Sequence, residues 1–123
     1  QAQARGHPPR GGPGRGVKTP ESYVLSSCLE YLALKGIFAW RNNSGAVKGP
    51  SGHLVRFGQK GSPDILGILP GGRLLCVECK GSGGKLRPEQ VEWLNGASQA
   101  GACVVVAYGF DDIQRQFLKE GIQ

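Results

Sequence analysis

The sequence predicts an α/β fold in which helices pack on a mixed β-sheet, with the elements in the order α-β-β-β-β-α-β-α. Two short apolar runs, Ile65–Leu69 and Leu74–Val77, flank Pro70-Gly71-Gly72, a pattern typical of an antiparallel hairpin. A β-branched apolar run, 103–107, follows a helical stretch, so a right-handed crossover should place it parallel to the strand that begins at Leu74. At 123 residues and 39% hydrophobic, the chain fits one soluble domain with a modest core.

Residues 1–18 differ from the rest of the chain, because they are rich in Gly, Pro and Arg and hold only one sizeable apolar residue, Val17. Such a segment cannot bury enough surface to offset its ordering entropy, so we expect a disordered basic tail followed by a domain over residues 19–123. The tail supplies +4 of the net charge of +6, from Arg5, Arg10, Arg15 and Lys18. A basic chain suits a polyanionic partner, although a solvated segment also explains this tail.

The folded part is expected to begin with a helix. Thr19 is a typical N-cap and Pro20 a typical first helical residue, and apolar residues then recur at helical spacing up to Gly36, at Leu25, Cys28, Leu29 and Leu32. At about 100° per residue, Glu21 projects near the same line. We therefore expect its carboxylate at the end of the inward-facing stripe and not on the wet face of the helix.

Two further strands should precede the hairpin. Ile37–Trp40 predicts the first, Arg41–Gly45 predicts a turn, and Gly49–Gly52 predicts a loop before the second strand, His53–Phe57.

Helices should follow the hairpin. Gly81–Lys85 predicts a flexible loop, and Pro88 begins a helix that ends at Gly101, with inward side chains at Val91, Leu94 and Ala97. Asp111 is expected to cap a last short helix, whose apolar pair lies four residues apart, at Ile113 and Phe117.

Three charged residues interrupt the apolar hairpin: Asp64 at the start of one strand, and Glu78 and Lys80 at the end of the other. If the Pro-Gly-Gly segment forms a three-residue loop, Leu69 pairs with Arg73. Counting back along both strands then places Asp64 directly opposite Glu78, on the same face of the sheet. Lys80 shares that face, because side chains alternate along a strand.

Two carboxylates side by side repel each other, and a solvated polar face is the simplest explanation for such a pair. Both strands are too apolar for an ordinary half-wet edge, however, and a divalent cation would remove the repulsion. Mg²⁺ typically binds one or two carboxylates together with waters and substrate phosphates. A neighbouring lysine can orient or deprotonate a metal-bound water, or stabilise charge on a phosphate. The pattern predicts a site for phosphodiester hydrolysis.

The same residues carry a resemblance to a known family. Pro63-Asp64, followed by Glu78-Cys79-Lys80, resembles the PD-(D/E)xK nuclease signature. Over about residues 19–113 the chain is similar to the VRR-NUC subfamily, the virus-type replication-repair nucleases, at Glu21, Arg41-Asn42-Asn43-Ser44-Gly45, Gly61-Ser62-Pro63-Asp64-Ile65 and Gln90. The resemblance implies a restriction-endonuclease-like α/β/α sandwich.

The resemblance also implies an activity, that of a Mg²⁺- or Mn²⁺-dependent DNA endonuclease. Asp64 and Glu78 would hold the metal, with the backbone carbonyl of Cys79 as a further ligand. Lys80 would position or activate the water. These residues would form the centre of the site.

Two more residues are expected beside this centre. Gln90 would orient the phosphate or the lysine, and Glu21 would complete the acidic cluster through a water or a second metal. Cations of the neighbouring strands and loops are expected to contact DNA, namely Arg41, His53, Arg56, Lys60 and Lys85. Stand-alone relatives are associated with branched DNA, including Holliday junctions, and act as homodimers; flap substrates fit the same expectation.

Other classes of function stay open. The chain could be a nuclease-fold DNA-binding module without catalysis, although a site that has lost its activity has no need for two repelling carboxylates. An RNA-binding protein acting through the Arg-Gly tail is a third alternative, but the chain lacks the aromatic platform expected for stacking single-stranded bases.

Four cysteines raise the question of zinc or disulfides. Cys76 and Cys79 have zinc-knuckle spacing, but on a strand they face opposite sides and no second pair follows, which argues against zinc and excludes a disulfide between them. Cys28 and Cys103 are expected to be small buried hydrophobes. This usage fits a reducing intracellular compartment, the cytoplasm, nucleoid or nucleus, and no apolar run suits a signal peptide or a transmembrane helix.

Overall fold

The computed structural model describes residues 19–123, and the tail expected over residues 1–18 lies outside this range. The elements are, in order, α1 (Pro20–Leu34), β1 (Phe38–Arg41), β2 (Gly45–Lys48), β3 (Leu54–Phe57), β4 (Ile65–Ile68), β5 (Leu74–Cys79), α2 (Pro88–Gln99), β6 (Cys103–Ala107) and α3 (Phe110–Glu120). The predicted α/β class is confirmed, and the chain has one strand more than expected, because Gly45–Lys48 forms β2.

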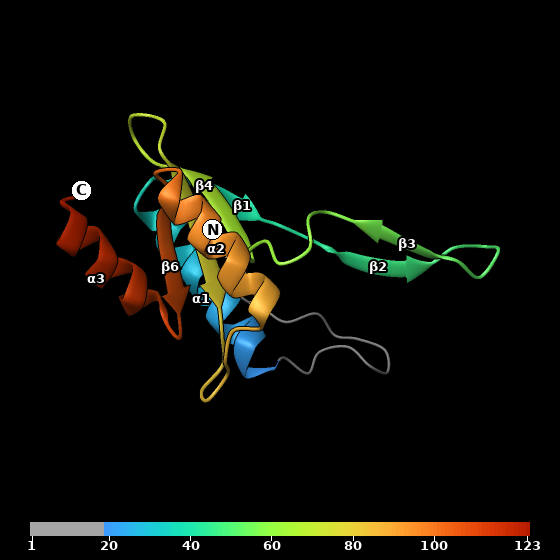
Figure 1. Ribbon diagram of the computed structural model, residues 1–123. Helices are drawn as coiled ribbons and strands as arrows, with labels where there is room; N and C mark the ends of the chain where they lie inside the picture. Colours follow the sequence, from blue (N-terminus) through green and yellow to red (C-terminus); the bar gives the residue numbers. More distant parts are fainter. Residues whose placement is uncertain (1–18) are drawn as a thin grey trace.

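The central sheet has four strands in the order β1-β4-β5-β6. The β1–β4 and β4–β5 pairs are antiparallel, and the β5–β6 pair is parallel, as the crossover through α2 predicts. Helices α1 and α3 pack on one face of this sheet and α2 lies on the other (Figure 1). The main apolar core lies between the sheet and the α1/α3 layer, and includes Cys28, Leu32, Val77, Ile113 and Phe117.

Helix α1 begins and ends as its sequence predicts. The Thr19 side chain accepts a hydrogen bond of 3.1 Å from the backbone N–H of Ser22, and Pro20 occupies the first helical position. Gly36 follows the C-cap with a φ of +73°, a conformation that glycine adopts without strain. The buried residues of the helix are Leu25, Cys28 and Leu32.

Two details of the later helices differ from the expectation. In α2 the inward face carries Gln90 and Leu94, whereas Val91 is 40% exposed. Leu94 lies about 40° around the helix from Gln90, whereas Val91 lies about 100° from Gln90 and about 60° from Leu94, at the edge of the inward face. In α3 the N-cap is Gly109 and not Asp111, which lies within the first turn.

Strands β2 and β3 form a second sheet of their own, in which Val47 lies opposite Val55. All eight of their residues are exposed, and the hairpin projects away from the rest of the molecule (Figure 1). The sequence of β2, Gly-Ala-Val-Lys, has little β-propensity of its own. The segment is a strand because it pairs with β3.

Candidate active site

The charged residues of the β4–β5 hairpin are arranged as the three-residue loop predicts. The backbone N–H of Leu69 donates to the carbonyl of Arg73 at 2.8 Å, and Ile65 lies opposite Val77. Continuing this confirmed register by one residue places Asp64 opposite Glu78, where both strands approach the open end of the sheet. A local turn thus sets the relative position of the two carboxylates.

Asp64 lies where the regular β4–β5 pairing ends, and its orientation is fixed by the backbone around it. Its Oδ2 accepts a hydrogen bond from the N–H of Cys79 at 2.8 Å, and its carbonyl accepts one from the N–H of Asn42 at 2.7 Å. The Asn42 side chain donates to the carbonyl of Pro63 at 2.9 Å. One carboxylate oxygen of Asp64 is therefore occupied, and Oδ1 is the oxygen left for a ligand.

Glu78, Lys80 and Gln90 form a buried network at the same end of β5. Their exposures are 2%, 5% and 5%. The Gln90 amide donates to Oε2 of Glu78 at 2.9 Å and its Oε1 accepts from Nζ of Lys80 at 3.1 Å. Nζ of Lys80 also lies 3.5 Å from Oε2 of Glu78. Gln90 therefore holds the carboxylate and the ammonium in one fixed arrangement.

The position of Gln90 follows from its place in the first turn of α2. Its Oε1 also accepts from the backbone N–H of Arg87 at 2.9 Å, which closes the beginning of the helix. Burial and three hydrogen bonds exclude an ordinary surface glutamine. The sequence placed Gln90 near the site but gave no sign that it would be buried in it.

The electrostatics of Glu78 are unfavourable for a carboxylate. Burial and, after it, the negative charge of Asp64 raise the pKa of the Glu78 carboxyl to about 7, although the neighbouring Lys80 acts in the opposite direction. Within residues 19–123, Oε1 of Glu78 is the only buried side-chain nitrogen or oxygen without a hydrogen-bond partner. A buried polar atom without a partner costs free energy, so this oxygen favours a ligand that brings positive charge.

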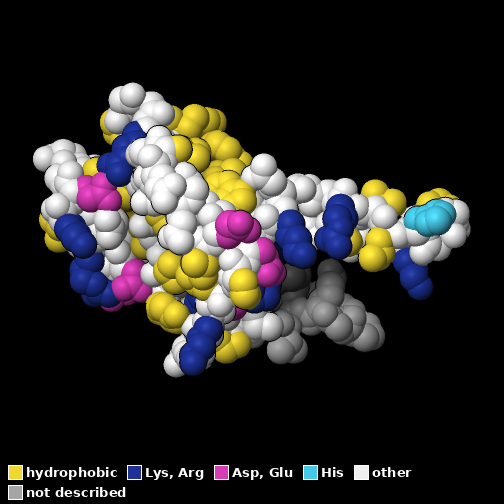
Figure 2. All heavy atoms as spheres, viewed as in Figure 1, with side chains coloured by type: hydrophobic (Ala, Val, Ile, Leu, Met, Phe, Trp, Pro, Cys, Tyr) yellow, Lys and Arg dark blue, Asp and Glu magenta, His cyan; other side chains and the backbone are white. Residues whose placement is uncertain are grey.

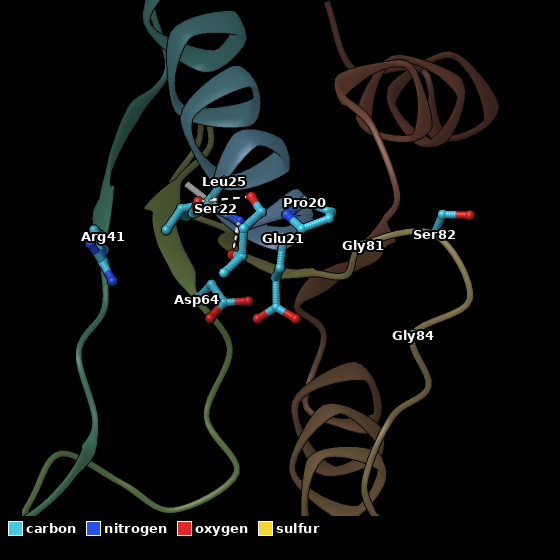
Figure 3. Close-up of a pocket in the computed structure, with 10 residues that line it drawn as sticks. Pro20, Glu21, Ser22, Leu25, Arg41, Asp64, Gly81, Ser82 and Gly84 are labelled. Atoms are coloured by element: carbon cyan, nitrogen blue, oxygen red, sulfur yellow. Dashed lines mark hydrogen bonds between the residues drawn. The ribbon is translucent and has the colours of Figure 1, made fainter. Parts of the chain in front are cut away.

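A cleft of about 530 Å³ opens beside Asp64 and is shown in Figure 3. Its walls are the first turn of α1, Arg41 on β1 and the loop Gly81–Gly84. Gly81 allows this close approach, because a Cβ there would lie 3.0 Å from Cβ of Pro20. The cleft is open to solvent and large enough for part of an extended substrate.

Glu21 lines this cleft, and its carboxylate and that of Asp64 point into the same space (Figure 3). The expectation that it faces inward is wrong in one respect, because its side chain is exposed. The first turn of α1 forms part of the cleft wall, so the inward direction at Glu21 leads into the cleft. Glu21 still lies near enough to Glu78 for its charge to add to the rise in the pKa of that residue.

The donor set of the site suits a divalent cation. Asp64 and Glu78 each offer one oxygen, and Mg²⁺ is commonly bound by one or two carboxylates with waters completing its shell. In the described part of the chain, no group of three or more His, Cys, Asp or Glu side chains is placed to hold a metal. The site therefore fits a hard cation held by few protein ligands, and Glu21 would contribute only through a water or a second ion.

The thiols of the four cysteines are buried and free. Cys79 belongs to the core on the α1 side of the sheet, whereas Cys76 does not. The two therefore face opposite sides of β5, as the strand alternation predicts.

The expected DNA-contacting residues are not gathered in one place. Arg41 lines the cleft, while Arg56 and Lys60 line a separate groove of about 170 Å³ between the β2–β3 hairpin and α2. His53 precedes β3 near the hairpin tip, and Lys85 is exposed on the loop after β5. Sequence reasoning did not single out Arg87, which lines the groove with Arg56 and Lys60. Its position just before the helix-starting Pro88 was the available signal.

The mixed α/β sandwich, with two carboxylates and a lysine at the open end of a central hairpin, defines a nuclease-like fold. The model of the VRR-NUC domain matches residues 20–111, so the chain belongs to the VRR-NUC family and has a nuclease-type, DNA-processing function. No curated protein and no solved structure shows significant similarity to the chain. Across residues 19–123, every helix is too short or too polar to cross a bilayer.

Proposed function

We propose that this protein is a Mg²⁺- or Mn²⁺-dependent endonuclease that hydrolyses phosphodiester bonds in DNA. The observation that carries the proposal is the unpartnered Oε1 of Glu78, buried beside Asp64. A buried carboxylate oxygen without a partner is electrostatically unfavourable in the folded protein, and a bound cation would compensate for its negative charge.

Each residue has a role that its contacts support. Asp64, Glu78 and the backbone carbonyl of Cys79 would hold the ion, which when bound polarises a phosphate oxygen and lowers the pKa of water. The Lys80 ammonium has three N–H donors. Two of them face Gln90 and Glu78, which leaves one without a protein partner in this network. That remaining donor can orient the attacking water or a phosphate oxygen. Gln90 positions Lys80, and Glu21 extends the acidic wall of the cleft.

Branched DNA, of the Holliday-junction or flap type, is the proposed substrate. A junction requires two strand cuts, and one site per chain then requires two chains. We propose a homodimer that forms through the half of the sheet that α2 leaves uncovered. Phe38, Ile68 and Leu74 lie directly opposite one another there, with exposures of 69%, 41% and 38%. Figure 2 shows hydrophobic side chains gathered over β1 and β4.

The dimer is tested by analytical ultracentrifugation of a Phe38→Glu variant. A charge on this apolar face should convert dimer to monomer, because an unpaired charge is costly to bury. Leu118→Glu is the matched control, since Leu118 is 74% exposed on α3, away from this face. A wild-type monomer at micromolar concentration would contradict the dimer.

The alternative function is a DNA-binding module without catalysis. One experiment distinguishes this module from the proposed enzyme. Labelled four-way junction, flap and linear duplex are incubated with the protein in Mg²⁺, Mn²⁺ or excess EDTA, and cleavage is measured. We expect cleavage that needs the metal and is fastest on a branched substrate. Binding without cleavage on all three substrates would establish the alternative.

Two variants test the assigned residues. Asp64→Asn keeps an acceptor for the Cys79 N–H and should reduce cleavage below detection, whereas Lys80→Ala should slow it by about 10²–10⁴-fold. Asp111→Asn is the matched control, because Asp111 is exposed and its contact is with Arg115. Far-UV circular dichroism and DNA binding in EDTA report whether each variant is folded. Full activity of Lys80→Ala would exclude its proposed role.

A further inference from the structure

The β2–β3 hairpin has no function in the site described above. Its strands pair only with each other and its eight residues are exposed. A two-stranded hairpin is at best marginally stable in water by itself, so one that projects in this way is expected to gain stability from a partner. Its surface must therefore show what that partner is.

The two faces of the hairpin differ in chemistry. Opposed residues share a face, so Val47, Val55 and Phe57 lie on one side, and the Phe57 ring covers Gly45. Lys48, Leu54 and Arg56 lie on the other. The arm therefore has an apolar face and a basic face.

Its charge is of one sign. Between Gly45 and Phe57 the sequence has no Asp or Glu, while it holds Lys48 and Arg56 in addition to His53. Figure 2 shows Lys and Arg side chains along the projecting hairpin and a histidine at its end, with no acidic side chain on it in that view. A uniformly cationic arm is complementary to a polyanion and would repel a second copy of itself.

The base of the arm is held firmly against the body. Gly58 has a φ of +70°, and a Cβ there would lie 2.5 Å from the carbonyl oxygen of Asn43. At Gly61 a Cβ would lie 2.4 Å from the carbonyl oxygen of Glu89, in the first turn of α2. The Trp93 indole N–H also donates to the Gln59 side chain. These contacts fix where the arm begins relative to the helix that carries Gln90.

A groove with more cations than acids joins the arm to α2. Arg56, Lys60 and Arg87 line this groove of about 170 Å³ at the arm's base, together with Glu89, which pairs with Arg87 at 2.9 Å. Arg87 caps the helix whose third residue is Gln90. From Gly45 to the tip at Pro50, an extended chain at about 3.4 Å per residue reaches about 20 Å, more than half of a duplex turn of about 34 Å. A two-stranded ribbon fits a DNA groove, and apolar side chains can contact sugars and base edges there.

We propose that the β2–β3 hairpin is a DNA-binding arm that embraces about six base pairs of duplex beside the cleavage site, independently of base sequence. Lys48 and Arg56 contact phosphates, and the apolar side chains contact the floor of the groove. The inference rests on the proposed function in taking DNA as the substrate, but it does not depend on cleavage. The strands present no Asn, Gln, Asp or Glu to read base edges, and their two cations are assigned to phosphates, so the proposed contact is independent of sequence.

The apolar face does not change this assignment. Its three side chains are about half exposed, and together they offer roughly 300 Å² if a large side chain presents about 200 Å². A stable protein–protein interface takes about 800 Å² from each partner. The arm is therefore too small to be an interface by itself.

The test is DNA binding by the full chain in EDTA, where cleavage does not interfere. Lys48→Ala/Arg56→Ala should reduce the slope of log Kd against log salt by about 2, because two phosphate contacts are lost. Between 50 and 200 mM salt the wild type should then lose about ten-fold more affinity than the variant. Lys35→Ala/Lys119→Ala removes two exposed cations elsewhere, and should leave the slope as in the wild type. An unchanged slope in the arm variant would overturn the proposal.

Two further measurements complete the test. Shortening the duplex on one side of a branched substrate below about six base pairs should weaken wild-type binding but not binding by the arm variant. Sedimentation must show the same oligomeric state for both proteins, and a change from dimer to monomer with an unchanged salt slope would make the arm an interface between copies. If the wild type binds no DNA, the proposed function fails together with the arm. If the wild type binds and cuts DNA and the arm variant binds and cuts it with the same salt dependence, the proposed function stands and only the proposal of a DNA-binding arm is rejected.

Discussion

The molecule contains two antiparallel hairpins of similar length that are used in opposite ways. In β4–β5 most side chains are buried, and Asp64 and Glu78 are held at its open end. In β2–β3 every side chain is exposed, and its cations lie along a projecting arm. Burying a charged side chain costs free energy and fixes its position. An exposed charged side chain costs little and can contact a binding partner. The first hairpin is suited to chemistry and the second to binding.

The largest difference should appear in stability, through a matched pair of leucines. Leu75 in β5 is fully buried, whereas Leu54 in β3 is 65% exposed. Leu75→Ala should lower the free energy of unfolding by about 2–5 kcal/mol because it leaves a cavity. Leu54→Ala should change it by less than about 0.5 kcal/mol. Urea denaturation measures both, and equal losses would show that the arm packs against the body in solution.

The second prediction concerns the cost of the buried carboxylate in metal-free protein. The pKa of Glu78 is raised from 4.5 to about 7 by burial, so the folded state holds this proton more tightly than the unfolded chain. Below pH 4.5 the ionisation of Glu78 does not lower the free energy of unfolding. The loss of stability grows as the pH rises from 4.5 to about 7, and it stays constant at higher pH. Glu78→Gln should therefore be more stable than wild type by about 3 kcal/mol at pH 8 and equally stable at pH 4.

Thermal or urea unfolding in EDTA at both pH values measures this effect. The exposed Glu92→Gln is the control, and should show no such dependence on pH. Adding Mg²⁺ at pH 8 should stabilise the wild type but not Glu78→Gln, because only the carboxylate would bind the ion. A stability difference that is the same at pH 4 and pH 8 would contradict the assigned burial cost.

Glu21 tests how far the site extends beyond the hairpin. As part of the acidic wall, Glu21→Gln should lower activity about 10–100-fold and raise the Mg²⁺ concentration required. As a helix-end acid alone, it would contribute about 0.3–1 kcal/mol of stability and leave turnover intact. Mg²⁺ titrations of the cleavage rate distinguish the two, and Glu30→Gln on the exposed side of α1 is the matched control.

The last prediction concerns a local effect, at the base of the arm. Gly58→Ala places a side chain at a φ of +70° and against the carbonyl of Asn43, which should cost about 1–3 kcal/mol, confined to the hairpin. Gly36→Ala has a similar φ of +73° but meets nothing within 4 Å, so it isolates the contribution of φ. Hydrogen exchange of the β2 and β3 amides should increase in the first variant only. Unchanged exchange would mean that the arm is not anchored there.

The comparison of the hairpins also shows where sequence reasoning succeeds. Ile65–Leu69 and Leu74–Val77 are two apolar runs on either side of a recognisable turn, so both the strands and their register were predicted correctly. In the other hairpin β3 was predicted, one residue too long, but β2 was assigned to a turn and to unassigned chain. An exposed strand needs no apolar periodicity, so its sequence carries little signal beyond that of its partner.

The sequence by itself determined the beginnings of α1 and α2, the β4–β5 register and the position of Asp64 opposite Glu78. These features depend on caps, turns and strand alternation, which act over a few residues. Only the tertiary structure decided that Gln90 and not Val91 faces the sheet, that Glu21 lines an open cleft, and that Oε1 of Glu78 is left without a partner. Each of these depends on which distant segments pack together, because burial and the pairing of polar atoms are properties of all neighbours at once.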